Sequence, residues 1–97
     1  MYTANTLSSA IEALGLSLPG SASTPAATEA KMVECREAGR HIRFMLEQDL
    51  RPSRLLTRRS FLNAMHVVVA LGGSTNAVIH LLAMAKAARV ELSIEDW

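Results

Sequence analysis

Cysteine is the scarcest reactive residue of this sequence, because its 97 residues include only Cys35. One cysteine cannot form an internal disulfide framework, and this is typical of a protein kept in a reducing, intracellular compartment. A single thiol is also too few ligands to hold a zinc ion or an iron–sulfur cluster. The sequence therefore predicts no metal site built from these 97 residues alone.

Aromatic residues and excess charge are scarce as well. Aromatic side chains make up 4% of the chain, whereas hydrophobic residues, mostly Ala, Leu, Val and Met, make up 49%. That mixture favours close-packed helices over a β-sandwich or barrel. Ten basic residues against nine acidic ones leave a net charge of +1, which gives no indication of a nucleic-acid or membrane partner. The longest apolar runs are far shorter than the roughly 20 residues of a membrane helix.

Apolar periodicity and helix-capping residues predict about four helices, so we expect a mainly α fold. The predicted helices cover residues 5–15, 25–51, 57–71 and 74–88. The residues expected to begin or stop them are Thr24 with Pro25, Pro52, Thr57, Gly72 and Ser74. A buried strand over residues 66–71 is an alternative that propensity leaves open. Residues 90–94 are expected to form a short extended piece, before a further helix start over residues 93–96.

The second predicted helix has an amphipathic pattern that defines an inner face. The residues expected on that face are Met32, Cys35, Ala38, Ile42, Met45 and Leu46. Cys35 is therefore expected to be a small core residue and not a ligand. His66 and His80 lie inside apolar runs and are expected to be core histidines bonded to backbone, whereas His41 is expected at the surface. The arginine-rich connector over residues 51–59 is expected to be a solvated loop, with contact to a phosphate or an acidic partner as the alternative.

Two glycines and three small polar residues, Gly72 to Asn76, interrupt the apolar sequence near its C-terminal end. One interpretation is a corner between helices, with glycine for the turn and Ser74 for the cap. The other is a helix start whose first amides, around Thr75 to Ala77, are free to bind a carboxylate or phosphate. No lysine follows the glycines, so this is not a phosphate-binding loop of the P-loop type. No paired carboxylates and no Ser–His–Asp set appear, so we predict no catalytic residue.

Two stretches together resemble a known enzyme family. "MYTANTLSSAIEALGLSLPGSAS" near the start and "ALGGSTNAV" over residues 70–78 are similar to dihydroxy-acid dehydratases, and the linking segment is similar to the family's own spacer. The resemblance implies a hydro-lyase of valine and isoleucine biosynthesis that converts 2,3-dihydroxy-3-alkyl carboxylates to 2-keto acids. It also implies an iron–sulfur cluster, two-iron or four-iron, a magnesium ion and a homodimer. In such an enzyme, this segment would belong to an N-terminal α/β domain and supply helices that cover a parallel sheet.

The resemblance places the reactive groups outside these 97 residues. The family's cluster cysteines and first magnesium-binding acids would lie upstream, and a serine base and a glutamate ligand downstream. We therefore expect residues 1–97 to be one fragment without an internal domain boundary, which binds no cofactor alone and is inactive alone. Met1, Thr3 and Asn5 are expected to lie beside the cluster. Ser74, Thr75 and Asn76 are expected to bind substrate.

Two further expectations concern an alternative function and the cellular compartment. The pattern at both ends looks cut from something larger, so a truncated helical module that binds a partner or self-associates is the alternative function. Bacterial cytoplasm, mitochondrion and plastid all fit as the compartment.

Overall fold

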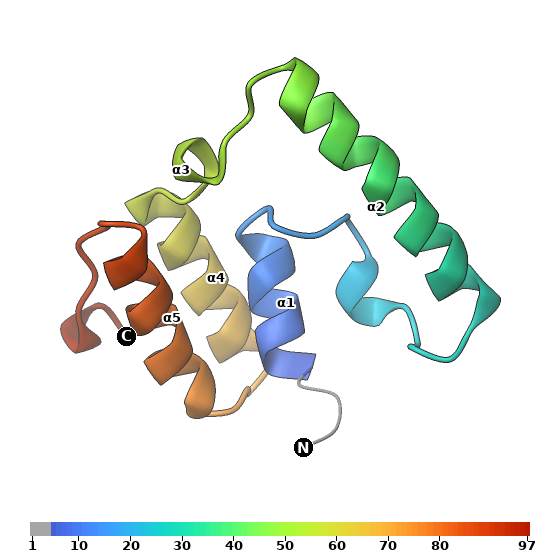
Figure 1. The fold of residues 1–97 in the computed structure, drawn as a ribbon. Coiled ribbons are helices and arrows are strands. Elements are labelled where there is room, and N and C mark those ends of the chain that lie inside the picture. The colour runs from blue at the N-terminus through green and yellow to red at the C-terminus, as the bar shows by residue number, and fades with distance from the viewer. Residues whose placement is uncertain (1–4) are drawn as a thin grey trace.

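The computed structural model describes residues 5–97, and within that range it contains helices and no strands (Figure 1). The elements are α1 (Asn5–Ala13), η1 (Ser21–Ser23), α2 (Glu29–Glu47), α3 (Pro52–Leu55), α4 (Arg58–Ala70), α5 (Asn76–Ala87) and η2 (Ile94–Asp96). The predicted mainly α fold with four longer helices is confirmed. The single turn of α3, which begins at a proline, lies in the connector that was expected to be a loop.

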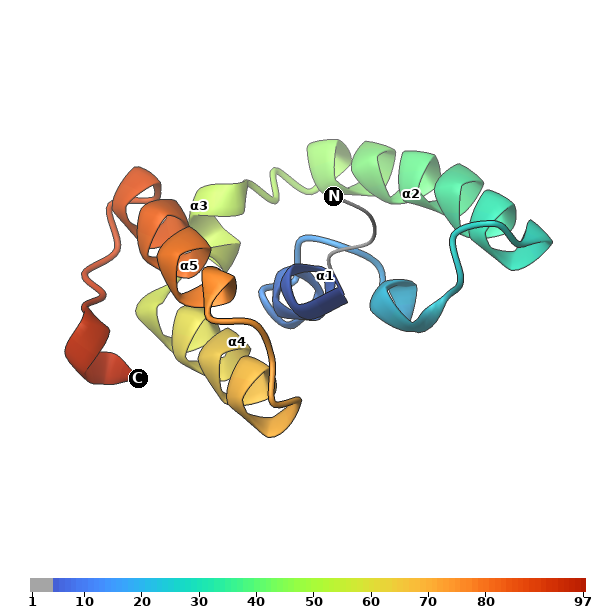
Figure 2. The ribbon, with the colours of Figure 1, turned by 90° about the horizontal axis from the view of Figure 1, so that it is seen from below.

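The core lies where α1, α4 and α5 meet (Figures 1 and 2). Its buried residues are Ala10, Leu14, Phe61, Ala64, Met65, Val68, Ala77, Leu81 and Ala85. Alanine is frequent on all three helices, and its short side chain lets helix axes approach closely around a few large residues. Phe61 and Leu81 are the largest side chains that are completely buried. Half-buried residues from the C-terminal segment, among them Trp97, pack against this core.

A capping box sets the start of α4. The Thr57 side chain accepts the N–H of Ser60 at 3.2 Å, and the Ser60 hydroxyl accepts the N–H of Thr57 at 2.9 Å. These bonds satisfy two amides that an uncapped helix would leave without partners. The strand alternative for residues 66–71 is therefore wrong: residues 66–70 continue this helix, and Leu71 is its C-cap.

The start of α2 corrects one prediction. The residue that caps it is Thr28, whose Oγ1 accepts the N–H of Lys31 at 3.3 Å, and the helix begins at Glu29 instead of Pro25. Thr24 does not cap this helix; its hydroxyl donates to the carbonyl of Gly20, four residues earlier, at 3.1 Å. Both threonines are competent caps, and the sequence alone does not choose between them.

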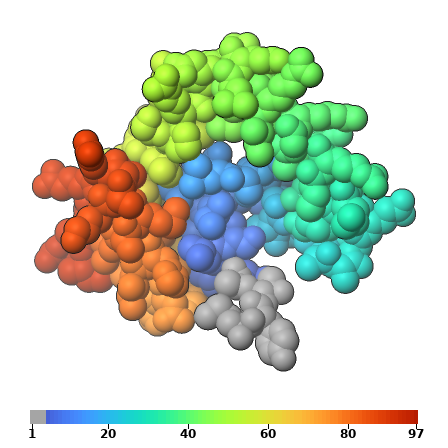
Figure 3. Space-filling model, in the orientation of Figure 1, coloured from blue at the N-terminus to red at the C-terminus, as the bar shows by residue number. Residues whose placement is uncertain are grey.

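The predicted inner face of α2 is also wrong, because this helix buries no residue. Figures 1 and 2 show α2 along one edge of the molecule, away from α4 and α5, and Figure 3 shows its atoms on the outside. Met32, Cys35, Ile42 and Leu46 are exposed, and Leu46 keeps 77% of its surface. The amphipathic pattern is present, but in the part of the chain that the structure describes no element covers this face.

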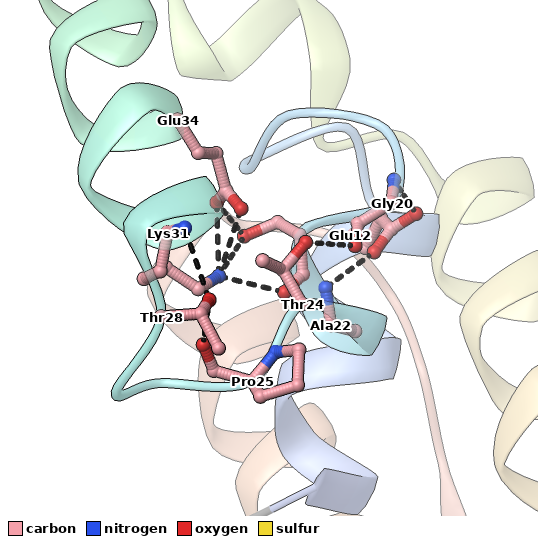
Figure 4. Close-up of polar contacts among 9 residues, drawn as sticks. Glu12, Gly20, Ala22, Thr24, Pro25, Thr28, Lys31 and Glu34 are labelled. Carbon is pink, nitrogen blue, oxygen red and sulfur yellow. Dashed lines mark hydrogen bonds and ion pairs between the residues drawn. The ribbon is translucent and has the colours of Figure 1, made fainter.

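Polar contacts link α2 to the chain before it (Figure 4). The Lys31 ammonium donates to the carbonyl of Ser21 at 2.8 Å and pairs with the Glu34 carboxylate at 2.9 Å, and the Ser21 hydroxyl also donates to Glu34. On the α1 side of the same loop, the Glu12 carboxylate accepts the N–H groups of Gly20 (2.6 Å) and Ala22 (2.8 Å). These amides lower the pKa of Glu12, and the Ser21 hydroxyl with Lys31 lowers that of Glu34. This network, not apolar packing, holds the start of α2 near α1.

The two histidine predictions for the core are wrong, because His66 and His80 are exposed, as His41 is. They lie on the outer faces of α4 and α5, next to Val69 and Ile79, which keep 65% and 67% of their surface. An apolar run therefore did not mark a buried face here. None of the helices among residues 5–97 is long and apolar enough to cross a bilayer.

The segment after α5 forms no strand; Ser93 is extended, and Ile94 already belongs to the turn η2. The predicted helix start at Ser93 forms one turn, η2, in which the Asp96 carboxylate accepts the N–H of Ser93 at 2.9 Å. The same carboxylate receives the Arg58 guanidinium in two hydrogen bonds, at 2.6 and 3.1 Å. Arg58 thus joins the first turn of α4 to the C-terminal segment, and these donors lower the pKa of Asp96 to about 2.

Asp96 predicts how the stability of this segment depends on pH. Its folded pKa of about 2 lies below its usual value of 3.8, so the ionised carboxylate stabilises the fold above about pH 4. That contribution is lost as the pH falls from about 4 to about 2. We expect Asp96→Asn to lower the urea midpoint at pH 5 and to flatten its decline below pH 4, measured by Trp97 fluorescence. Asp49→Asn is the control, since Asp49 forms only exposed ion pairs. An equal acid decline in wild type and Asp96→Asn would contradict this account.

Candidate functional site

The two sequence stretches that carry the family resemblance meet in space. Thr6, in the first turn of α1, accepts the backbone N–H of Ser74 on its Oγ1 at 3.2 Å, although the two residues are 68 positions apart. Figure 1 shows this end of α1 beside the loop that joins α4 to α5. The site is therefore built from one helix start and one interhelical turn, both anchored to the same core.

Glycine ends α4 at this turn. Gly72 has a φ of +60°, a conformation that other residues adopt at a cost. Its N–H donates to the carbonyl of Val69 and that of Gly73 to the carbonyl of Val68, both at 3.0 Å. This pair of bonds is a Schellman motif, which satisfies carbonyls at the end of the helix. The prediction that the glycines stop this helix is confirmed.

Gly73 is needed for a different reason, because the chain approaches α1 closely there. A Cβ placed on Gly73 would lie 2.5 Å from the Thr6 methyl carbon, and 3.2 Å from both Thr6 Oγ1 and the Val68 carbonyl oxygen. Real carbon atoms do not tolerate the first of these distances. Glycine at this position therefore lets the turn lie directly on Thr6.

Local bonds already satisfy most of the amides predicted to be free at the start of α5. The Ser74 Oγ accepts the N–H of Asn76 at 3.2 Å, and the Ser74 carbonyl accepts that of Ala77 at 3.0 Å. The predicted cap at Ser74 is one residue too early, because α5 begins at Asn76 and its N-cap is Thr75, whose side chain makes no capping bond. The Ser74 hydroxyl still bonds the first amide of the helix. Among residues 5–97, the N–H of Thr75 has no acceptor. The corner interpretation therefore accounts for two of the three amides.

The predicted substrate-binding side chains lie together on one turn. Ser74, Thr75 and Asn76 are all exposed, and they stand at the positive end of the α5 dipole. Such a place favours a carboxylate, which can accept hydrogen bonds from hydroxyl, amide and N–H donors. The contacts that build the turn itself join uncharged groups.

The other predicted site residues are only partly described. Met1 and Thr3 lie outside the described residues. Asn5 is exposed at the start of α1, where its carbonyl accepts the Ser9 hydroxyl at 3.0 Å. It also borders a groove of about 470 Å³ that extends to η1 and Lys31.

Metal ligands are sparse in the described part of the chain. Residues 5–97 contain no group of three His, Cys, Asp or Glu side chains able to hold a metal ion. Cys35, which was expected in the core, is an exposed residue of α2.

Thr6 is the residue of this site that sequence reasoning missed as a functional contact. Its partner lies 68 residues away, and no local pattern links the two positions. The only signal in the sequence was its place at the end of "MYTANT", inside the stretch that carries the resemblance.

A family model and individual relatives both match this chain to dihydroxy-acid dehydratases. A family model described as "Dihydroxy-acid/6-phosphogluconate dehydratase N-terminal" matches residues 1–97. A dihydroxy-acid dehydratase of Flavobacterium psychrophilum is 56% identical over 97 residues, which cover 100% of this chain and 17% of that protein. The corresponding protein of Francisella tularensis subsp. novicida gives the same three percentages. A mitochondrial one of Aspergillus fumigatus is 55% identical over 100% of this chain and 16% of its own length. The chain thus spans about a sixth of the length of these relatives.

Proposed function

This chain belongs to the dihydroxy-acid/6-phosphogluconate dehydratase family, and from this membership we propose that it serves as one segment of a dihydroxy-acid dehydratase. That enzyme would be a hydro-lyase that removes water from a 2,3-dihydroxy-3-alkyl carboxylate to give a 2-keto acid, in valine and isoleucine biosynthesis. Within it, Ser74, Thr75 and Asn76 would line the substrate pocket.

One observation carries the proposal: Thr6 Oγ1 and the Ser74 N–H are hydrogen-bonded at 3.2 Å. From the family resemblance we expect Met1, Thr3 and Asn5, in the segment before Thr6, to lie beside the cluster. The contact brings the turn of Ser74 to Asn76 next to the start of α1, which Asn5 begins. A substrate held between them would have its carboxylate within reach of the Thr75 N–H and the exposed side chains at the start of α5.

The cofactors belong to the same proposal. An iron–sulfur cluster and magnesium would be held by residues outside positions 5–97 and would act as Lewis acids on the departing hydroxyl and the carboxylate. The residues of this chain would bind and orient the substrate. They would carry out no proton transfer, because no paired carboxylates or nucleophile–base set appears in the sequence.

Exposed apolar surface supports the idea that this segment packs against further protein. The large apolar side chains that are at least half exposed, or nearly so, are Met32, Val33, Ile42, Phe44, Leu46, Val69, Leu71, Ile79 and Ile94. Self-contained monomers rarely leave so much apolar surface without a partner. We propose that the outer faces of α2, α4 and α5 pack against the sheet and helices of a longer α/β domain, in a homodimeric intracellular enzyme. Bacterial cytoplasm, mitochondrion and plastid remain the candidate compartments, and one relative is mitochondrial.

A segment exchange tests this function. In the Flavobacterium psychrophilum relative, the 97 matched residues would be replaced by this chain, and formation of 2-keto acid would be measured after reconstitution with iron and sulfide. We expect the chimera to be active and the isolated chain, treated in the same way, to be inactive. An inactive chimera that nevertheless binds its cluster would contradict the proposal, and so would turnover by the isolated chain.

A module that binds a partner is the second candidate, and the exposed face of α2 is the observation that favours it. Size-exclusion chromatography with light scattering separates the two functions. A stable, saturable dimer of the isolated chain whose formation depends on Ile42 and Leu46 would favour the module. A monomer, or weak association without a fixed stoichiometry, would favour the dehydratase segment.

A further inference from the structure

We propose that Thr6 is a positioning residue, which fixes the turn of Ser74 to Asn76 in its place on α1; its effect on substrate rests on the proposed function. The proposal depends on two contacts made by one side chain. The Thr6 hydroxyl accepts the Ser74 N–H at 3.2 Å, and the Thr6 methyl faces Gly73, where a Cβ would approach it to 2.5 Å. The first contact is directional and the second is steric, so together they fix both the position and the orientation of the turn.

Thr6 is suited to this role because its own position is well fixed. It lies one turn before Ala10 and two before Leu14, which are completely or almost completely buried in the core. Threonine in a helix adopts two χ1 rotamers. The packing of the Thr6 methyl group on Gly73 selects the rotamer that points the hydroxyl at the Ser74 N–H.

The Thr6 contact is also the first link in a short chain of hydrogen bonds. Thr6 Oγ1 holds the N–H of Ser74, and Ser74 Oγ in turn holds the N–H of Asn76 at 3.2 Å. If the first link is lost, the Ser74 backbone can move away from α1, and the capping hydroxyl moves with it. The orientation of Thr75 and Asn76 therefore depends on a residue that does not itself need to touch substrate.

Two conservative substitutions separate the contacts. Thr6→Val keeps the branched shape and removes the hydroxyl, whereas Thr6→Ser keeps the hydroxyl and removes the methyl group. Ser9→Ala is the matched control, since it removes a hydroxyl of the same helix whose one bond within residues 5–97 is to the carbonyl of Asn5.

Amide exchange at Ser74 tests the positioning role without any activity measurement. In the 97-residue chain, we expect Thr6→Val to speed hydrogen exchange at Ser74 about five- to tenfold, which is the change expected from one ordinary hydrogen bond. Thr6→Ser and Ser9→Ala should leave it within about twofold. NMR of the labelled protein gives this rate while showing that exchange at Leu81 in the core is unchanged. Unaltered exchange at Ser74 in Thr6→Val would overturn the proposal.

The consequence for substrate is measured in the chimeric enzyme. Thr6→Val should raise KM for the dihydroxy acid about tenfold with a smaller change in kcat, while the cluster absorbance and melting temperature stay near those of the parent. Thr6→Ser should restore KM to within about threefold. An equal rise in both variants would overturn the role of the hydroxyl. An inactive chimera together with the expected exchange result would reject the proposed function and leave the positioning of the turn supported.

Discussion

Replacing Phe61 with alanine is expected to lower the free energy of unfolding by about 3–5 kcal/mol, the cost of removing a buried aromatic side chain and leaving a cavity. Phe61 has no exposed surface and lies in the core formed by α1, α4 and α5. The helices around it are rich in alanine, whose side chains are too short to fill the space that is left. Since small domains have only about 5–15 kcal/mol of stability, this single substitution removes a large share of it.

The second phenylalanine of the chain provides a matched control. Phe44 lies on α2 and keeps 52% of its surface, so Phe44→Ala should change the free energy of unfolding by only about 0.5 kcal/mol. Urea unfolding followed by the fluorescence of Trp97 measures both variants, and a Phe61→Ala midpoint shift of about 3 M is expected for a chain of this size. A loss of about 3 kcal/mol or more in Phe44→Ala would show that α2 is packed in solution, and a small loss in Phe61→Ala would contradict the core described.

The core helices could be predicted from the sequence because their signals are local. Thr57 with Ser60 forms the box that begins α4, and Gly72 at positive φ ends it. A capping hydroxyl and a glycine act within a few residues of their own positions, so the sequence contains all that is needed. Phe61, Ala64 and Val68 lie on one face of α4, and all three are buried.

The surroundings of α2 could not be predicted in this way. Its apolar spacing identifies residues that would gain from burial, but burial also requires another element to cover them. Among the described residues no such element is present, so Ile42 and Leu46 stay exposed. The same reasoning explains His66 and His80, since an apolar run says nothing about which face of a helix its neighbours cover.

The candidate site likewise has a local part that the sequence predicts and a long-range part that it does not. The corner of Gly72 to Asn76 follows from residue chemistry: its glycine stop is present, and Ser74 Oγ bonds the Asn76 N–H, although the N-cap is Thr75. Its contact with Thr6 is a long-range tertiary pairing, which one sequence cannot reveal. Whether Ser74, Thr75 and Asn76 bind substrate stays a prediction.

Gly73→Ala is expected to be the most damaging substitution in the turn. Its methyl group would lie 2.5 Å from the Thr6 methyl carbon and 3.2 Å from the Val68 carbonyl oxygen, so either the turn or α1 must move. Crowding of this kind costs about 1–3 kcal/mol of stability. In the chimeric dehydratase, a shift of the turn by about 1 Å should lower kcat/KM about a hundredfold, if these residues orient the substrate. Urea unfolding of the chain and steady-state kinetics of the chimera measure the two effects.

Gly72→Ala separates steric crowding from backbone strain. Gly72 has a φ of +60° with nothing within 4 Å of the added carbon, so alanine there should cost only about 1 kcal/mol, from strain alone. The double variant Thr6→Ser with Gly73→Ala makes the cause specific, because serine removes the methyl carbon that the new side chain meets. We expect the double variant to be more stable than the sum of the two single effects predicts, as residues in direct contact are coupled. Strictly additive effects would mean that Thr6 and Gly73 do not touch in solution. The contact between the start of α1 and the α4–α5 turn would then be rejected.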